Sequence, residues 1–244
     1  MSEFNEFDQQ GSVPDRDTGS IISHAFEMYK GVFLYAVVAM IIYGILGAII
    51  QSFTGMNSTA MMEEMKESGD YSSFSAFSAP GFPLYLTLSG ILGLLLSPLY
   101  VGLIYIINKY NTKNPIEFSD LFIGYKQNFV NIMIYALLAG VISTVALSLC
   151  VLPIIFVYPF LMLGYPILLF ENASATEALG KSFNIVKENY VVFLGVTFVG
   201  FLISMAGIVL CIIGIILTAP FIFAVMYSAY CAYLGKPREI ILNK

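Results

Sequence analysis

Charged residues are scarce in this chain of 244 residues. Asp, Glu, Lys and Arg together make up 11% of the sequence, whereas soluble domains contain about 25%. Hydrophobic residues reach 58%, which is more apolar surface than one globular core can remove from water. The composition excludes an ordinary soluble domain and indicates a membrane protein.

Side chains that could act in catalysis, metal binding or ion transport are equally rare. His24 is the only histidine, and no acid is placed to orient it, so we expect an interfacial residue rather than a base. Charges buried within membrane spans mark ion pathways. No apolar run carries a charge well inside it, and Glu171, at the end of one run, comes closest. No basic patch could hold phosphate backbones. The sequence therefore predicts no catalytic residue, cofactor, metal or nucleic-acid partner, and no ion pump.

Two long stretches carry no charge at all. One of 44 residues lies between Lys126 and Glu171, and another of 47 residues ends before Lys236. A helix of that length would approach roughly 70 Å, twice the hydrocarbon thickness of a bilayer, so each stretch must fold back, near Pro153 and Gly214. The apolar runs predict an all-α protein with six membrane-spanning helices, at 32–52, 83–107, 129–149, 153–170, 190–211 and 214–234.

The basic residues predict the orientation. With these six spans, ten of the eleven Lys and Arg residues fall on one side of the membrane and only Lys66 on the other. Under the positive-inside rule both termini are then cytoplasmic. Residues 1–18 are polar and acidic without a basic start, so we expect a flexible cytoplasmic tail rather than a signal peptide; 235–244 is a second cytoplasmic tail.

An internal repeat accounts for the spans. Residues 117–172 align without a gap with 178–233 at a shift of 61, and a shift of 96 brings in the N-terminal third. We therefore predict three parallel units of one interfacial helix and one helical hairpin, related by pseudo-threefold symmetry. The predicted units are 19–108, with an external insertion at about 52–82, then 114–172 and 174–234.

Each predicted unit begins with an aromatic residue, a lysine four residues later and a second aromatic residue before the span. The three sets are Phe26, Lys30 and Phe33, then Phe122, Lys126 and Phe129, then Phe183, Lys187 and Tyr190. We interpret them as membrane anchors, with rings in the acyl boundary and lysines at the headgroups; a binding surface built from the three helices is the alternative. Capping boxes predict helix starts at Asn114 with Glu117 and at Ser174 with Glu177.

One proline recurs in each return span, at Pro98, Pro159 and Pro220. Each should kink its helix, because proline lacks the N–H that would bond four residues back. The carbonyls released in this way belong to Leu94, Ile155 and Ile216. They either line a polar cavity on the symmetry axis or are satisfied by hydroxyls nearby, at Ser97 or Thr218.

The predicted external side holds sulfur-containing residues. Met56, Met61, Met62 and Met65 could bind Cu(I) through their thioethers, although a short amphipathic helix on the membrane also explains them. Cys150 and Cys211 fall at equivalent ends of two spans. They either form a disulfide or are buried as small apolar residues.

The stretch LLFENASATEALGKSFNIVKENYVVFLGV, at 168–196, carries a resemblance. Its matching residues are Glu171, Glu177, Ala178, Leu179, Ser182, Phe183 and Lys187. It resembles a group of bacterial polytopic membrane proteins that includes the membrane domain attached to some glycerophosphodiester phosphodiesterases. Phe183 stands where that group commonly has tryptophan, and this chain has none. The resemblance implies a bacterial inner-membrane module, and because no hydrolase domain follows Lys244 we expect none of that activity.

The function expected first is a non-enzymatic scaffold or accessory subunit. It would contact lipids and a membrane-protein partner through the lead-in helices and the loop at 52–82. The alternative is a facilitator or transporter of a small or amphipathic solute, and copper handling by the methionines comes third. The substrate, the partner and the oligomeric state do not follow from the sequence.

Overall fold

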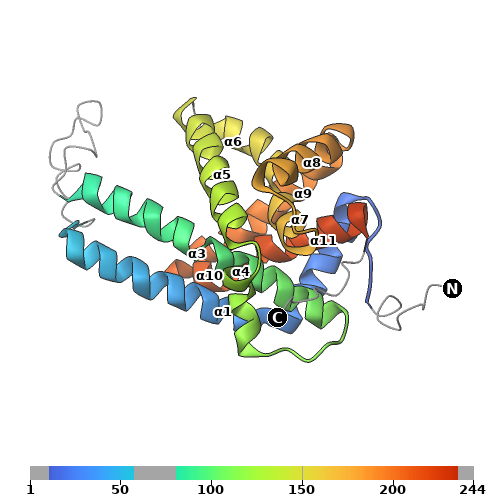
Figure 1. Ribbon diagram of the computed structural model, residues 1–244, viewed down its shortest axis with the longest axis horizontal. Coiled ribbons are helices and arrows are strands. Elements are labelled where there is room, and N and C mark those ends of the chain that lie inside the picture. The colour runs from blue at the N-terminus through green and yellow to red at the C-terminus, as the bar shows by residue number, and fades with distance from the viewer. Residues whose placement is uncertain (1–10, 58–80, 150, 236–244) are drawn as a thin grey trace. The chain divides into compact units, whose positions relative to one another are not determined.

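The computed structural model describes residues 11–57, 81–149 and 151–235, and the regular structure within these ranges is helical (Figure 1). Met61, Met62, Met65 and Cys150, and the side chain of Cys211, lie outside what is described. The chain divides into two units. The first comprises residues 1–40 and 97–244, and the second comprises residues 41–96.

Five described helical stretches, some of them made of consecutive shorter helices, are long and apolar enough to cross a membrane, or six when a bent pair counts as one span. The five are Thr18–Thr54, Phe82–Asn111, Phe129–Ser148, Pro153–Phe170 and Gly214–Leu234. The bent pair joins Ala175–Glu188 to Tyr190–Ala206 at an angle of 105°. The chain is therefore an all-helical, multi-pass membrane protein, and each predicted span overlaps one of these segments.

The helices follow one another along the chain as α1 (Thr18–Thr54), α3 (Phe82–Asn111), the 3-10 helix η3 (Phe118–Phe122), α4 (Ile123–Lys126), α5 (Phe129–Leu149), α6 (Val151–Val157), the 3-10 helix η4 (Tyr158–Leu161), α7 (Gly164–Phe170), α8 (Ala175–Glu188), α9 (Tyr190–Ala206), the 3-10 helix η5 (Gly207–Leu210), α10 (Cys211–Thr218) and α11 (Phe221–Leu234).

The second unit contains the end of α1 and the beginning of α3. Its large apolar side chains are widely exposed, with Phe53 at 76% and Ile49 at 58%. Exposure of such residues would be costly in water but is ordinary for a helix face that meets lipid.

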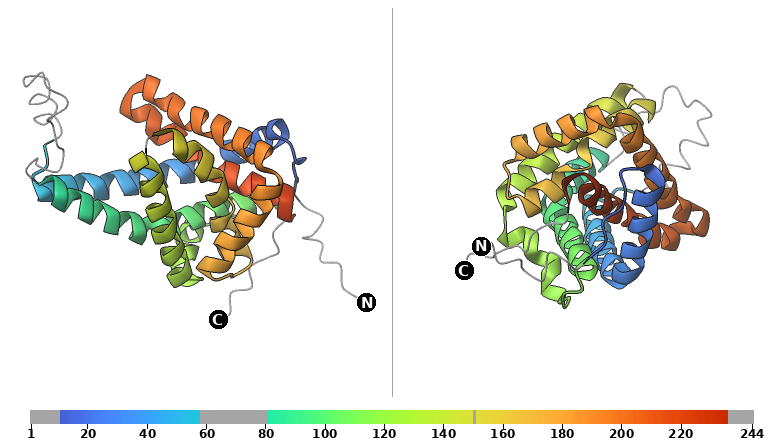
Figure 2. Two further views of the ribbon diagram at one scale, coloured as in Figure 1. Left: turned by 90° about the horizontal axis from the view of Figure 1, so that it is seen from above. Right: turned by 90° about the vertical axis from the view of Figure 1, so that its right-hand side faces the viewer.

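In the first unit α11 supplies the centre. Its residues 224–232 are all buried, and it packs against α7 and α9 (Figure 2). Glycines permit the closest approaches in this unit: a Cβ on Gly164 would overlap the ring of Tyr135, and one on Gly102 would overlap the backbone of Leu121. These two contacts fix α7 against α5 and α3 against η3.

Helix α8 begins where the sequence predicts. The Ser174 hydroxyl accepts from the Glu177 N–H at 3.3 Å, and the Glu177 carboxylate accepts from the Ser174 N–H at 2.9 Å. This reciprocal pair is the predicted capping box. Polar residues cover one side of α8 and Ala175, Ala178, Ser182 and Val186 are buried on the other, which is the pattern of an interfacial helix.

The predicted start at Asn114 is wrong. Residues 114–117 are not helical, and η3 begins at Phe118 with Glu117 as its N-cap. The Asp120 carboxylate accepts from the Glu117 N–H at 2.7 Å, so the cap lies three residues later than predicted. Glu117 and Asp120 form a capping box of their own, and this pair sets where the helix begins.

The three predicted units differ at their lead-in helices. Asn128 stands between α4 and α5, and Asn189 stands between α8 and α9, at positions that the shift of 61 equates. The equivalent position in the first unit is Val32, and α1 runs through it without interruption. A separate lead-in helix is therefore absent from the described part of the first unit, and the threefold repeat stays a prediction.

The three recurring prolines also differ in their settings. Pro98 lies inside the continuous helix α3. Pro159 lies in η4, between α6 and α7, and Pro220 is the N-cap of α11. The span predicted at 153–170 is accordingly made of three short helices in series.

Candidate functional site: a hydroxyl-lined pocket

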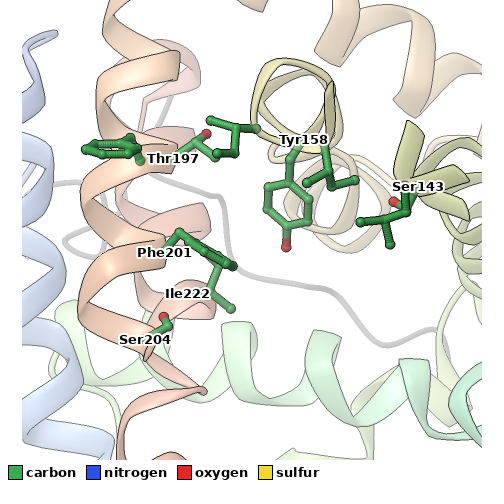
Figure 3. Close-up of a pocket in the computed structure, with 10 residues that line it drawn as sticks. Ser143, Tyr158, Thr197, Phe201, Ser204 and Ile222 are labelled. Atoms are coloured by element: carbon green, nitrogen blue, oxygen red, sulfur yellow. The ribbon is translucent and has the colours of Figure 1, made fainter. Parts of the chain in front are cut away.

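A pocket of ≈ 330 Å³ lies among α5, α6, α9 and α11, within the first unit. Four hydroxyl side chains, those of Ser143, Tyr158, Thr197 and Ser204, line it together with apolar residues that include Phe201 and Ile222 (Figure 3). We call it the hydroxyl pocket. Its volume is near the lower limit of the roughly 300–1,000 Å³ that small-molecule sites occupy.

Two features of the local structure place these hydroxyls. Thr197 and Ser204 are seven residues apart on α9, which is two helical turns, so they lie on one face. Tyr158 is the first residue of η4, at the break that precedes Pro159, and its ring points into the space between α5 and α9 (Figure 3). The change from α6 to η4 thus occurs at the tyrosine that lines the pocket, and the kink predicted at Pro159 stays a prediction.

The hydroxyls of Thr197 and Ser204 have different partners. Thr197 Oγ1 lies 2.8 Å from Met162 Sδ in a buried contact. Ser204 Oγ is buried and has no hydrogen-bond partner among the described residues, while the Ser204 carbonyl accepts from Thr218 at 2.7 Å. Leaving a buried hydroxyl unpaired costs about 1–3 kcal/mol. Ser204 Oγ is therefore a polar group whose hydrogen-bonding capacity the described residues leave unused.

No charged residue is among those that line the hydroxyl pocket. Within the described ranges no group of three or more His, Cys, Asp or Glu residues could hold a metal ion. The lining is apolar apart from the hydroxyls, so the pocket can bind an apolar body and offer hydrogen bonds to one polar group. It holds no group with which to move a proton near neutral pH.

Of the three residues whose carbonyls the prolines should release, Ile155 is among those that line the hydroxyl pocket. The Thr218 hydroxyl, expected near the Ile216 carbonyl, instead donates to Ser204 and Gly214 carbonyls. The pocket lies between parts of the second and third predicted units rather than around a threefold axis.

The predicted anchor lysines, Lys30, Lys126 and Lys187, are all exposed. Phe26, Phe33 and Phe183 are exposed, and Phe122, Phe129 and Tyr190 are partly buried. Neighbouring rings connect them locally: Phe183 and Tyr190 both stack on Phe160, at 4.9 and 5.4 Å between ring centroids. The membrane-anchor interpretation of these nine residues remains a prediction.

His24 belongs to a buried polar cluster that the sequence did not reveal. Its Nδ1 shares a hydrogen bond of 2.8 Å with Ser228 Oγ on α11, and its Nε2 lies 3.0 Å from Ser12 Oγ. Asn111 Nδ2 donates to Tyr227 Oη at 2.9 Å, close to the same place. We call this group the His24 network; its members are Ser12, His24, Asn108, Asn111, Tyr227 and Ser228.

The network holds the segment before α1 in place. Asn111 accepts from the Ser12 N–H at 2.8 Å and donates to the Ser12 carbonyl at 2.9 Å. Further along, Arg16 Nε donates to the Ala232 carbonyl at 3.1 Å, and its guanidinium lies 5.3 Å from the Tyr233 ring centroid. Residues 11–17, which we expected to belong to a flexible tail, are therefore bonded to α3 and α11.

Comparison with protein-family models, with curated proteins and with solved structures finds no match to this chain. The resemblance at 168–196 stays a prediction. The function has to be argued from the geometry.

Proposed function

We propose that the chain is a non-enzymatic multi-pass membrane protein that binds a small amphipathic molecule in the hydroxyl pocket and carries it within or across the bilayer. The observation that supports this most directly is the buried, unpartnered Ser204 Oγ of a residue that lines an uncharged, largely apolar pocket. A ligand with an apolar body and one hydrogen-bonding group would satisfy that atom and replace lipid at the apolar walls.

The setting of the protein is part of the proposal. We place it in a bacterial inner membrane with both termini in the cytoplasm, on the distribution of Lys and Arg and on the resemblance at 168–196. The three units of interfacial helix and hairpin belong to this picture. The bend of 105° between α8 and α9 supports it for the third unit, since such an angle lays one helix along the interface while the other crosses.

The role of scaffold or accessory subunit remains the second candidate. It depends on the lead-in helices and on the loop at 52–82, of which 58–80 lies outside the described residues. The proposal for the loop methionines and copper rests on that same segment. The hydroxyl pocket is lined by residues of defined position and supports the binding role more directly.

Photo-crosslinking tests the proposed role. The purified protein is placed in phosphatidylcholine nanodiscs, labelled with a long-chain alcohol that carries a diazirine in its tail, and digested to find the labelled peptides. We expect labelling of α5 and α9 that an excess of the plain alcohol removes. Ser204→Phe should abolish it by filling the pocket, whereas Ser148→Phe, on an exposed face of α5, should not.

A second measurement separates binding from transport. Liposomes that contain the protein are assayed for flux of an amphipathic solute that protein-free liposomes retain, and Pro159→Ala is compared with the native sequence. Unchanged flux in this variant would remove the argument that the break at Pro159 shapes the pathway. Labelling spread evenly over the lipid-facing helices, without competition, would remove the binding site itself.

A further inference from the structure

A second cavity adjoins the hydroxyl pocket. It has a volume of ≈ 320 Å³, and Ser143 and Tyr158 line both cavities. Tyrosine dominates its walls, in contrast to the first. We call it the tyrosine chamber; its tyrosines are Tyr100, Tyr135, Tyr158 and Tyr165.

The rings of the tyrosine chamber stand at steep angles to one another. Tyr165 meets Tyr135 at 5.1 Å between ring centroids and 73°, and it meets Tyr100 at 6.4 Å and 71°. The four tyrosines belong to four different helices, with Tyr100 on α3, Tyr135 on α5, Tyr158 on η4 and Tyr165 on α7. The chamber is therefore bordered by aromatic residues that come from separate parts of the fold.

These walls are held firmly. The Tyr135 hydroxyl donates to the Leu161 carbonyl at 2.6 Å, and its side chain is almost fully buried. Gly164 lies so close to the Tyr135 ring that any side chain there would overlap it. On the far side Phe223 stacks on Tyr100 at 4.7 Å. An aromatic site with fixed rings loses little conformational entropy when it binds a ligand.

Charge decides which ligand suits the tyrosine chamber. No Asp, Glu, Lys, Arg or His is among the residues that line either cavity. A compact ion buried there would have no counter-charge, and the cost would be prohibitive. A diffuse cation such as a quaternary ammonium needs no counter-ion, because the faces of aromatic rings attract it through their quadrupoles.

We propose that the two cavities form one site for an amphipathic organic cation, with a quaternary ammonium head in the tyrosine chamber and an apolar tail in the hydroxyl pocket. The inference rests on the proposed function and names its ligand class. The shared residues Ser143 and Tyr158 mark the junction between head and tail.

Three photoreactive probes test this ligand class in nanodiscs of phosphatidylcholine. They carry the same alkyl chain with a diazirine and end in trimethylammonium, in the uncharged tert-butyl group of the same shape, or in carboxylate. Probe concentrations are expressed as mole fraction in the bilayer, so that different partitioning does not affect the comparison. We expect half-maximal labelling by trimethylammonium at on the order of tenfold lower mole fraction than by tert-butyl.

Two substitutions at Tyr165 distinguish the contribution of its aromatic ring to ligand preference from that of its hydroxyl. Tyr165→Phe keeps the aromatic face and should keep the preference for trimethylammonium, whereas Tyr165→Leu should lose it. Labelling by the tert-butyl probe reports whether the pocket of the leucine variant is intact. If Tyr165→Leu keeps this labelling but loses the preference for trimethylammonium over tert-butyl, misfolding is not the cause.

The outcomes are distinguishable. Equal labelling by trimethylammonium and tert-butyl, or a preference for carboxylate, overturns the ligand class and leaves the proposed function standing. A preference that Tyr165→Phe abolishes also overturns it, because the hydroxyl and not the ring would then be responsible. Failure of every probe to label α5 or α9 overturns the inference and the proposed function together.

Discussion

His24 Nδ1 lies 2.8 Å from Ser228 Oγ, although 204 residues separate the two along the chain. The contact joins the first turns of α1 to the middle of α11. Through Ser12 and Asn111 it continues to the segment before α1 and to the end of α3. One buried network therefore fastens three helices and an extended segment in the first unit.

Replacing His24 should weaken the whole network. We expect His24→Ala to destabilise the protein by about 1–3 kcal/mol, because Ser228 Oγ then loses its buried partner. For a chain of this size that corresponds to a fall of the unfolding midpoint by a few degrees, on the order of 2–4 °C for each kcal/mol. Thermal unfolding in detergent measures it.

The matched control is Ser23→Ala, on the exposed side of the same helix. It should leave the midpoint unchanged. If His24→Ala and Ser228→Ala each lower the midpoint and the double variant lowers it by their full sum, the two residues are not coupled and the network has been misread.

Adding a methyl group at Gly102 should be costly. The new Cβ would overlap the backbone of Leu121, which cannot move aside as a flexible side chain could. We expect Gly102→Ala to destabilise by about 1–3 kcal/mol in the same unfolding assay.

The control for this substitution lies on the same helix. Nothing lies within 4 Å of a Cβ added at Gly93, so Gly93→Ala should be neutral, or stabilising by up to about 1 kcal/mol. Equal effects of the two alanines would show that α3 does not approach η3 as closely as described.

Helix α8 should lose its N-terminal cap in acid. Hydrogen bonds from the backbone N–H and the side chain of Ser174 hold the pKa of the Glu177 carboxyl below its usual value. A carboxyl whose pKa is lower when folded stabilises the helix above the unfolded pKa, near 4.5, and this contribution is lost as the pH falls through the folded value. We expect the protection factors at the start of α8, which compare the measured exchange with the intrinsic rate at each pH, to fall over that range.

Glu177→Gln removes the titrating group, so the protection factors at the start of α8 should no longer depend on pH in that window. Glu188→Gln, at the other end of the helix, should keep the dependence of the native chain. A native helix whose exchange shows no acid transition beyond the intrinsic one would argue against the capping box.

The membrane topology can be tested with single cysteines. Asn57 and Glu117 are exposed and should lie on opposite sides of the membrane if α3 crosses it. After the native cysteines are replaced, an impermeant maleimide applied from outside should label Asn57→Cys in intact cells and Glu117→Cys only after lysis. Labelling of both from one side would refute the proposed arrangement of spans.

The sequence determined the elements that depend on composition and local spacing. Apolar runs without charge located the spans, because each must cover its backbone and its side chains against lipid. The start of α8 followed from Ser174 and Glu177, a contact between residues three apart. The start expected at Asn114 failed because Glu117 pairs with Asp120 at the same spacing three residues later, and local pattern does not choose between the two pairs.

Only the tertiary structure decided the sites. The uncharged walls of the hydroxyl pocket combine Ser143, Tyr158 and Thr197 from separate helices, and His24 finds Ser228 near the other end of the chain. No spacing encodes such pairs, because they arise from how helices cross. The three predicted units also differ at one equivalent position. Asn128 and Asn189 each stand between two helices, whereas Val32 lies within the continuous helix α1. The pattern of apolarity is local and survives in sequence, whereas a cavity depends on several long-range contacts at once.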